Sequence, residues 1–298
     1  MRIRVAQPDD APDVVALRAT VVPYLVRGVE STRKMIAEPP PGEDWAAFVA
    51  EVDGRVVGWV SAERIGTTSV ANVGGINLLH VHPEHRRRGI GTALLTAATD
   101  HLRPLGVRRV RAMALPDALP FARRHGYEPS REVRYSALNL NPAPALPEPP
   151  PGVRLRPIAD LDPHLLYVAN TASSLDEPGD VPVDAQSYES WQYDVWDNLG
   201  LDKAASTAAE VDGVVVAFSL VKRDGDRMWS DYTGSIPGYR GRGLARLSKM
   251  AALHRAAANG VRIAYTSNDE TNAPMLAINA RLGYRPVAAQ WSCLADLT

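Results

Sequence analysis

Two stretches of the chain repeat the same order of apolar and polar positions. Each stretch opens with a short predicted strand, residues 3–5 or 153–155, and continues into a segment with helical spacing. Two β-rich runs then flank Asp53-Gly54 in the first stretch and Asp212-Gly213 in the second, and Asp-Gly favours the positive backbone angles of a hairpin turn. The shared order predicts that one mixed α/β domain occurs twice.

The later part of each stretch continues the parallel. A third β-rich run leads into a glycine-containing loop, an amphipathic helix, a further strand and a last helix that ends at Gly126 or Gly283. In the first stretch Pro116 and Pro120 shorten the last helix, because proline lacks the amide proton that a helix interior requires. The predicted strands around the loop cover residues 76–81 and 107–115 in the first stretch, and 229–236 and 261–267 in the second.

The spacing between the two copies stays nearly constant. It is 159 residues at the hairpin, 154 at the glycine loop and 157 at the last glycine, which favours duplication of one domain. Residues 141–152 are rich in proline and cannot supply the hydrogen bonds of a strand or helix. We therefore expect an N-terminal domain over residues 1–140, a linker over 141–152 and a C-terminal domain over 153–298.

Composition limits the classes of partner. Lys and Arg number 33 against 34 Asp and Glu, so the net charge of -1 gives no general attraction to nucleic acid or an anionic membrane. Cys293 is the only cysteine, which excludes an intrachain disulfide and a cysteine zinc cluster. No apolar run approaches the roughly 20 residues of a membrane helix. We expect a cytoplasmic protein, monomeric or homodimeric, that binds small molecules rather than nucleic acid or a membrane.

The repeated loop is the main candidate binding site. It reads Arg-Arg-Arg-Gly-Ile-Gly at residues 86–91 and Arg-Gly-Arg-Gly-Leu-Ala at residues 240–245, each time between a strand and a helix. Backbone amides at a helix N-terminus are available to a phosphate or pyrophosphate. The alternative is a tight turn with solvated arginines, but two copies in matched surroundings favour a phosphate site. The candidate cofactor-binding residues are Arg86, Arg87, Arg88, Gly89, Ile90 and Gly91, and Arg240, Gly241, Arg242, Gly243, Leu244 and Ala245.

The order of strand, Arg-x-x-Gly-x-Gly or Arg-x-x-Gly-x-Ala, helix, strand and a helix closing on Gly-Tyr resembles the GNAT family of acetyl-CoA-dependent N-acetyltransferases. The resemblance covers most of both copies. It implies an α/β fold of two tandem GNAT-like domains, each with a mixed, mostly antiparallel central sheet flanked by helices. It also implies acetyl-CoA as co-substrate, with its pyrophosphate on the loop amides.

Acetyl transfer to an amine requires a base that removes a proton from the nitrogen, directly or through water. Family members often carry a carboxylate for this purpose on the strand before the loop. Nine positions before the loop arginine stand Asp231 in the second copy and Asn77 in the first, and only Asp231 can act as a base. The alternative for Asp231 is a solvent-facing carboxylate. The resemblance thus implies catalysis in the second domain and a catalytically degenerate first domain.

The last helix departs from the family pattern. Family members often have a tyrosine four residues before the last glycine, and it protonates the departing CoA thiolate. Asn279 stands at this position, and an amide can hydrogen-bond a thiolate but cannot usefully protonate it. The resemblance also implies that Asn272 contacts CoA, whereas Ala273-Pro274 after it favours a helix N-cap, and the two roles are compatible. Leu115 and Ala122 occupy these places in the first copy.

An acidic and aromatic segment is the candidate acceptor site. Trp191, Tyr193 and Trp196 are interleaved with acids in a segment without Lys or Arg, and acids beside aromatic faces suit a cationic amine. The alternative is an acidic, solvated helix whose aromatic side chains pack in the core. The acids are Asp176, Glu177, Asp180, Asp184, Glu189, Asp194, Asp197 and Asp202.

Three histidines before the first loop, His80, His82 and His85, have only Glu84 as an acidic neighbour and no nearby cysteine, so we expect no metal site. His80 is an alternative base in the first domain. Thr266 and Asn268, at the end of a predicted strand of the second domain, are candidates for polar contacts to pantetheine or acceptor.

Together these features predict an enzyme that moves an acetyl group from acetyl-CoA to the amine of a small, cationic acceptor by direct attack in a ternary complex. Asp231 and Asn279 are the candidate catalytic residues. Trp191, Tyr193 and Trp196 are the candidate substrate-binding residues. The alternative is a non-catalytic protein that senses acetyl-CoA or binds a partner, because both copies lack the usual tyrosine.

Overall fold

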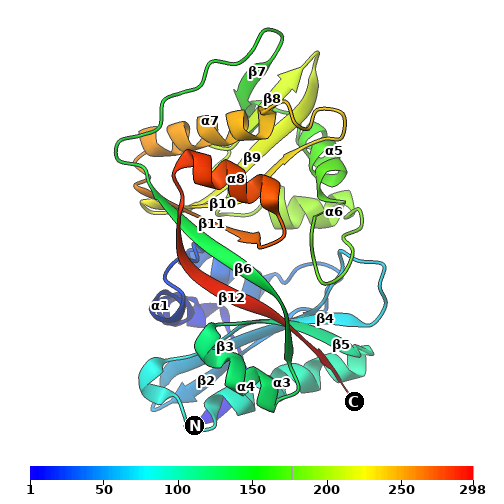
Figure 1. Cartoon of the computed structure of the whole chain (residues 1–298). Helices are drawn as coiled ribbons and strands as arrows, with labels where there is room; N and C mark the ends of the chain where they lie inside the picture. Colours follow the sequence, from blue (N-terminus) through cyan, green and yellow to red (C-terminus); the bar gives the residue numbers. More distant parts are fainter. Residues whose placement is uncertain (176, 298) are drawn as a thin grey trace. The chain divides into compact units, whose positions relative to one another are not determined.

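The computed structural model describes residues 1–175 and 177–297 (Figure 1). These residues form two compact units. Unit 1 contains Met1–Val133 together with the described residues from Ala289 onward, and unit 2 contains Arg134–Ala288. These units differ from the expected domains at their ends. Residues 134–140, expected in the N-terminal domain, belong to unit 2, and the described residues after Ala288, expected in the C-terminal domain, belong to unit 1.

The sheet of unit 1 is mixed. Its strands lie in the order β1-β2-β3-β4-β5, followed by the end of β12. β4 and β5 are parallel, whereas the other neighbouring pairs, from β1 to β4 and between β5 and β12, are antiparallel. The strands are β1 (Arg2–Val5), β2 (Ala46–Val52), β3 (Arg55–Arg64), β4 (Val73–Val81), β5 (Arg109–Ala114) and β12 (Arg285–Asp296).

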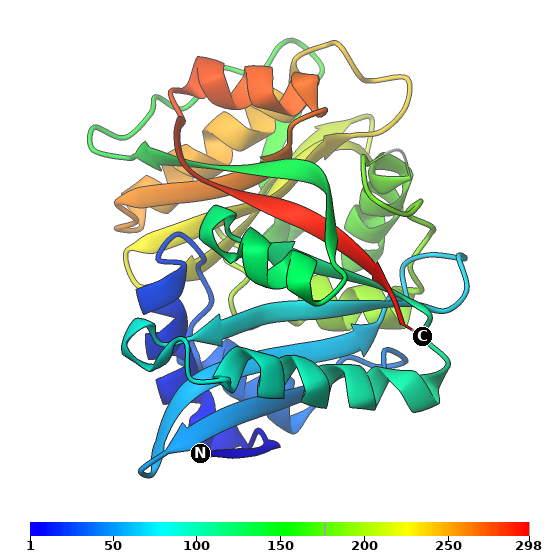
Figure 2. The ribbon, with the colours of Figure 1, turned by 60° about the horizontal axis from the view of Figure 1, so that its bottom comes forward.

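Helices cover both faces of this sheet. Val60 of β3 faces α3 and packs with Leu94, whereas its neighbour Trp59 faces α1 and packs with Leu17. This alternation follows from the two-residue period of a strand. Figure 2 shows α3 lying along one face of the sheet. The helices are α1 (Ala11–Val21), α2 (Val29–Ala37), α3 (Ile90–Leu102) and α4 (Leu119–Arg124).

Unit 2 has the same strand pattern. Its order is β7-β8-β9-β10-β11, followed by the end of β6, and β10 with β11 is the parallel pair. The strands are β6 (Glu128–Asn139), β7 (Arg154–Pro157), β8 (Thr207–Val211), β9 (Val214–Asp224), β10 (Arg227–Ser235) and β11 (Ile263–Asp269).

The helices of unit 2 also pack on both faces. Phe218 of β9 packs against Trp191 on the α5 and α6 side, whereas Val221 packs with Leu253 of α7. The helices are α5 (Pro163–Ser174), α6 (Tyr188–Trp191) with a π-helical continuation over Gln192–Trp196, α7 (Leu244–Ala258) and α8 (Ala273–Leu282). The expected fold class, with mixed and mostly antiparallel sheets flanked by helices, is confirmed.

The predicted repeat also holds in the register of the strands. Val73 pairs with Arg109 in unit 1, and Arg227 pairs with Ile263 in unit 2, so both strands of the parallel pair carry the 154-residue offset. Both hairpin turns at Asp-Gly have positive φ angles at both residues. Equivalent positions in the two units can therefore be compared directly.

Candidate functional site

A cavity of about 670 Å³ opens in unit 2 where two parallel strands separate. β10 and β11 pair only as far as Trp229 and Tyr265, and the β10–β9 ladder is irregular between Ser230 and Thr233. The strands therefore diverge beyond this point and leave room between them. Residues from β10, β11, the glycine loop and α7 line the cavity, including Ser230, Asp231, Thr266, Asn268, Ala245 and Lys249.

The glycine loop forms one end of this cavity. Gly241 and Gly243 have φ angles of +74° and +77°, and a Cβ atom at either position would meet nothing within 4 Å. Gly243 immediately precedes α7, so the first amides of this helix have no partner within the helix and lie at the positive end of its dipole. The loop backbone is accessible, and binding of a diphosphate to it stays a prediction.

The first arginine of each loop braces the backbone. Arg240 Nε donates a hydrogen bond to the carbonyl oxygen of Ser235 at 3.2 Å, and Arg86 Nε donates to that of Val81 at the same distance. Both acceptors lie at the end of the preceding strand. In unit 2 the Arg242 guanidinium lies 4.8 Å from the centre of the Tyr239 ring. One structural role of Arg86 and Arg240 is therefore to fix the loop against its strand.

The loop of unit 1 keeps the same backbone course with different side chains. Arg87 has a φ of +63° at the position of Gly241, and Gly89 has a φ of +80°. The side chains of Ile90 and Leu244 are buried in their cores, so these two residues present only backbone to a ligand. A Cβ atom on Gly91 would lie 3.4 Å from the ring of Phe121.

Arg88 and Arg87 are exposed at the surface of the unit 1 loop. Phe121 of α4 packs against the start of α3, whereas the equivalent residue of unit 2, Ile278, lines the cavity. An aromatic ring in this place leaves less room beside the unit 1 loop.

Asp231 lines the cavity and forms an ion pair. Its Oδ2 atom lies 2.9 Å from Lys222 Nζ, and 22% of its side chain is exposed. In the equivalent pair of unit 1, the uncharged side chain of Asn77 takes the place of Asp231. Its Nδ2 atom donates a hydrogen bond to Glu63 Oε1 at 2.8 Å. The carboxylate expected from the sequence is thus at the cavity, where Lys222 is its ion-pair partner.

Asn272 combines a cap with a position at the cavity. Its Oδ1 atom accepts a hydrogen bond from the amide of Met275 at 3.3 Å, which caps α8. Asn272 also lines the cavity. The predicted N-cap is therefore confirmed, and contact of Asn272 with CoA stays a prediction.

Asn279 belongs to a buried polar network. Its Oδ1 atom accepts a hydrogen bond from Lys249 Nζ at 2.8 Å, and its Nδ2 atom donates to Asn268 Oδ1 at 2.5 Å. Lys249 Nζ also lies 4.9 Å from the centre of the Tyr284 ring. The Tyr284 hydroxyl is hydrogen-bonded to Ser230 Oγ at 2.9 Å. The amide of Asn279 is thus occupied on both sides by side chains of its own unit.

Lys249 is the functional candidate that the sequence reasoning missed. Only 1% of this residue is exposed, and burial lowers the pKa of its ammonium group to about 7. Lysine on an amphipathic helix is normally expected on the solvent face. The available signal is spacing: Lys249 follows Ala245 by four residues, so the two share the α7 face that lines the cavity.

The predicted aromatic acceptor residues lie in different surroundings. Trp191 is 2% exposed, and its indole Nε1 donates to Asn170 Oδ1 at 2.7 Å within the core. Lys203 Nζ lies 4.2 Å from the centre of the Trp196 ring. Tyr193 is half-buried. The described residues that line the cavity include none of these three aromatics.

Among the described residues, Glu177 is the acid of this segment that lines the cavity. Asp202, in contrast, accepts a hydrogen bond from the amide of Ala205 at 2.9 Å and lies 4.0 Å from Arg223. Asp176 lies outside the described residues. The cavity therefore has a carboxylate from this segment and one from β10, whereas the aromatic rings pack elsewhere in unit 2.

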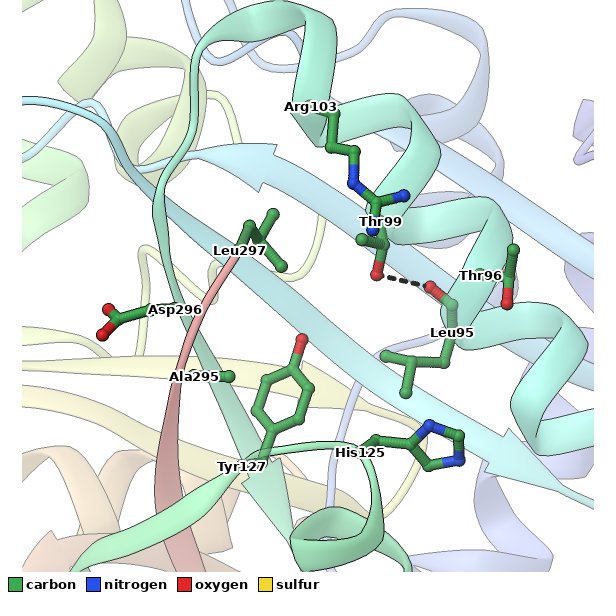
Figure 3. A pocket seen from close by; sticks show the side chains of 9 residues that line it. All are labelled: Leu95, Thr96, Thr99, Arg103, His125, Tyr127, Ala295, Asp296 and Leu297. Atoms are coloured by element: carbon green, nitrogen blue, oxygen red, sulfur yellow. Dashed lines mark hydrogen bonds between the residues drawn. The ribbon is translucent and has the colours of Figure 1, made fainter.

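Unit 1 has a smaller cavity of about 260 Å³ between α3 and the end of β12. Figure 3 shows the Tyr127 ring standing between the α3 side chains and the residues of β12. Among the described residues the Tyr127 hydroxyl has no hydrogen-bond partner, and burial raises its pKa to about 12.

The histidines of unit 1 are weak candidates for base or metal chemistry. Burial, together with Arg18 and Arg86, lowers the pKa of His80 to about 3, so the imidazole is neutral and a poor base near pH 7. Within residues 1–175 and 177–297, His, Cys, Asp and Glu side chains form no group of three or more that could hold a metal ion. None of the helices in these ranges is long and apolar enough to cross a membrane.

Comparison with known proteins identifies relatives over most of the chain. The profile of the acetyltransferase (GNAT) family matches residues 18–127 and 172–284. A mycothiol acetyltransferase from Nocardioides sp. is 30% identical over 293 residues, which cover 93% of this chain and 95% of the relative. A mycothiol acetyltransferase from Nocardiopsis dassonvillei is 29% identical and covers 86% of this chain and 83% of its own length. In fold, the chain is similar to a tandem GNAT protein from the clavulanic acid biosynthesis pathway, with a TM-score of 0.76, 22% identity, and coverage of 99% of this chain and 98% of that chain.

Proposed function

Because the chain belongs to the GNAT family of acetyltransferases, we propose that unit 2 binds acetyl-CoA in its cavity and transfers the acetyl group to the amine of a small, cationic molecule. The observation that carries this proposal is the position of the cavity of about 670 Å³, which extends from the N-terminus of α7 to the point where β10 and β11 separate. In unit 1 the corresponding loop serves the structure.

The residues at the cavity fit acetyl-CoA. The amides that follow Gly243, at the N-terminus of α7, would hold the diphosphate, and the unpaired backbone of β10 and β11 offers hydrogen bonds to an extended amide-containing chain. Bound acetyl-CoA supplies a thioester as the acetyl donor. Asn272, at the start of α8, provides a further polar contact.

Asp231 is the proposed base. It removes a proton from the acceptor amine, directly or through a water molecule, so that the neutral nitrogen attacks the thioester carbonyl in a ternary complex. Lys222 keeps the Asp231 carboxylate in place through their ion pair. The carboxylates of Asp231 and Glu177 both line the cavity, which favours an acceptor that arrives as a cation.

The first experiment is a turnover assay. Release of free CoA thiol is followed with the intact chain, acetyl-CoA and a panel of small amines that includes mycothiol-related amines, since relatives are named mycothiol acetyltransferases. We expect steady turnover with one class of cationic amine. Binding of acetyl-CoA without turnover of any amine would instead support the alternative of a non-catalytic acetyl-CoA sensor.

A further inference from the structure

We propose that Lys249 donates the proton that neutralises the departing CoA thiolate in unit 2, an inference that rests on the proposed function. In the step, the acceptor nitrogen forms a bond to the acetyl carbon and the carbon–sulfur bond breaks. The sulfur keeps the electron pair, and a proton moves from Lys249 Nζ to the sulfur. The proton lost by the amine goes to Asp231 or water, and solvent then returns a proton to Lys249.

The position of Lys249 supports this role. It lies one helical turn beyond Ala245 on α7, and both residues line the cavity. Its Nζ atom donates to Asn279 Oδ1 at 2.8 Å and lies against the ring of Tyr284, whose hydroxyl bonds Ser230. Ser230 is the first residue of β10 beyond the last pair with β11. The lysine therefore approaches the cavity at its inner end, where the two strands begin to separate.

Other polar groups in this region are engaged. Asn279 has no acidic proton, and its Nδ2 atom already donates to Asn268. The Tyr284 hydroxyl is paired with Ser230, and burial raises its pKa above the ordinary tyrosine value. Tyr232 also lines the cavity, but its hydroxyl donates to the carbonyl oxygen of Ser173 at 3.1 Å. Asn279 thus acts as the acceptor that orients the ammonium group.

The acidity of Lys249 fits the transfer. Burial lowers its pKa to about 7, whereas an ordinary thiol has a pKa of about 8.5. Proton transfer from this ammonium to a thiolate is therefore favourable. The titratable groups around the same space include Tyr284, which precedes β12, and Asp231 on β10 with its partner Lys222 on β9. Glu177, Tyr232 and Arg240 also line the cavity, and α8 contributes the uncharged Asn279.

The fold does not require this lysine. At the equivalent positions of unit 1, Leu95 replaces Lys249, Ala122 replaces Asn279 and Ile76 replaces Ser230. Leu95 and Ile76 belong to a continuous apolar core. Burying a lysine is costly, and the same fold is built with leucine in this place, so the polar network of unit 2 is explained better by chemistry than by packing.

The test measures the ionisation of the CoA thiol bound to the intact chain, through the ultraviolet absorbance of the thiolate across a pH titration. With its pKa of about 7, Lys249 is still partly charged when the bound thiol begins to ionise, and this charge stabilises the thiolate. We therefore expect part of the thiolate absorbance of the wild-type complex to shift to about pH 7, below the ionisation of an ordinary thiol at about 8.5. In Lys249→Met the shift should disappear. Arg246→Met, which removes a positive charge from the exposed side of α7, should keep the shift.

The outcomes separate the two proposals. If CoA binds but its thiol ionises at the same pH in the wild-type protein and in Lys249→Met, the role of Lys249 is wrong and the proposed function stands. If CoA does not bind the wild-type protein, both are wrong.

A kinetic measurement adds a second readout with the acceptor found in the turnover assay. The wild-type kcat should fall as pH rises above about 7, because the acid loses its proton. Lys249→Met should lower kcat roughly 10²-fold and lose this descending limb, with the KM for acetyl-CoA nearly unchanged. A descending limb that persists in Lys249→Met would overturn the role of Lys249.

Discussion

Unit 1 and unit 2 share a backbone but differ in the side chains beneath their glycine loops. The tyrosine after the last glycine is present in both, as Tyr127 and Tyr284. In unit 2 its hydroxyl bonds Ser230 and its ring contacts Lys249, whereas in unit 1 the hydroxyl has no partner among the described residues. The loop is thus a property of the repeated fold, whereas the polar contacts that join Ser230, Lys249 and Tyr284 belong to unit 2.

The second difference lies on the central strands. Lys222 and Asp231 form an ion pair at the cavity of unit 2, and Glu63 and Asn77 form a hydrogen bond at the equivalent positions of unit 1. The first pair joins β9 and β10 and the second joins the equivalent strands β3 and β4, so the fold accommodates either combination. Only the pair in unit 2 provides a carboxylate, Asp231, at the position expected for a base. A variant of Asp231 is therefore the sharpest test of the difference between the two units.

The largest effect is expected from Asp231→Asn. The amide keeps the size of the side chain but cannot accept the proton of the amine, so kcat should fall by roughly 10²- to 10⁴-fold. Asp224→Asn, at the exposed end of β9, is the matched control and should leave turnover unchanged. Steady-state kinetics measures both. Wild-type turnover in Asp231→Asn would remove Asp231 from the mechanism.

The second-largest difference between the two units is expected from substituting their loop glycines. Gly243 and Gly89 both have positive φ angles that a β-branched residue rarely adopts, so valine at either position strains its loop. We expect Gly243→Val to weaken acetyl-CoA binding by about 10²-fold, and Gly89→Val to leave turnover intact. Calorimetric titration gives affinity and stoichiometry. Equal losses of binding in both variants would mean that both loops hold the cofactor.

Lys249→Met should also change how stability depends on pH. The folded pKa of about 7 lies below the value of about 10.4 for a free lysine, so the unfolded chain binds more protons between these pH values. Wild-type stability should therefore rise relative to the variant by about 3 kcal/mol between pH 7 and 10. Urea unfolding at several pH values measures this. A parallel pH dependence in the two proteins would contradict a neutral lysine in the core.

The smallest effect is expected from removing the tyrosine hydroxyls. Tyr284→Phe leaves Ser230 without its partner and should lower the free energy of unfolding by about 1 kcal/mol, whereas Tyr127→Phe should be neutral or slightly stabilising. Thermal and urea unfolding of the pair of variants tests the contrast. A larger loss for Tyr127→Phe would show that its hydroxyl has a partner such as water.

Local signals predicted much of the fold. The Asp-Gly hairpins, the glycine before α3 and α7 and the Asn272 cap depend on a few adjacent residues, and these features are visible in the sequence. The shortened last helix of unit 1 followed from its prolines, since α4 covers only Leu119–Arg124.

Long-range contacts could not be predicted in the same way. The bond between Lys249 on α7 and Asn279 on α8 depends on how two helices pack, and the burial of Trp191 depends on the pairing of its indole with Asn170. The sequence pattern located Asp231 correctly on a strand but did not reveal Lys222 beside it. A sequence pattern indicates each of these side chains separately, whereas their chemistry depends on partners that are distant in the chain.

The strand β12 gives the protein an order of assembly. Its residues Trp291–Asp296 pair with β5, and Cys293 and Ala295 fill the core of unit 1. During synthesis, the ribosome therefore releases all of unit 2 before it releases the strand that completes the sheet of unit 1. Until then the edge of β5 stays unpaired, and an unpaired edge is open to association with other chains. Unit 1 is thus the first unit to be synthesised but the last to complete its sheet, and the folding of the two units is linked through β12.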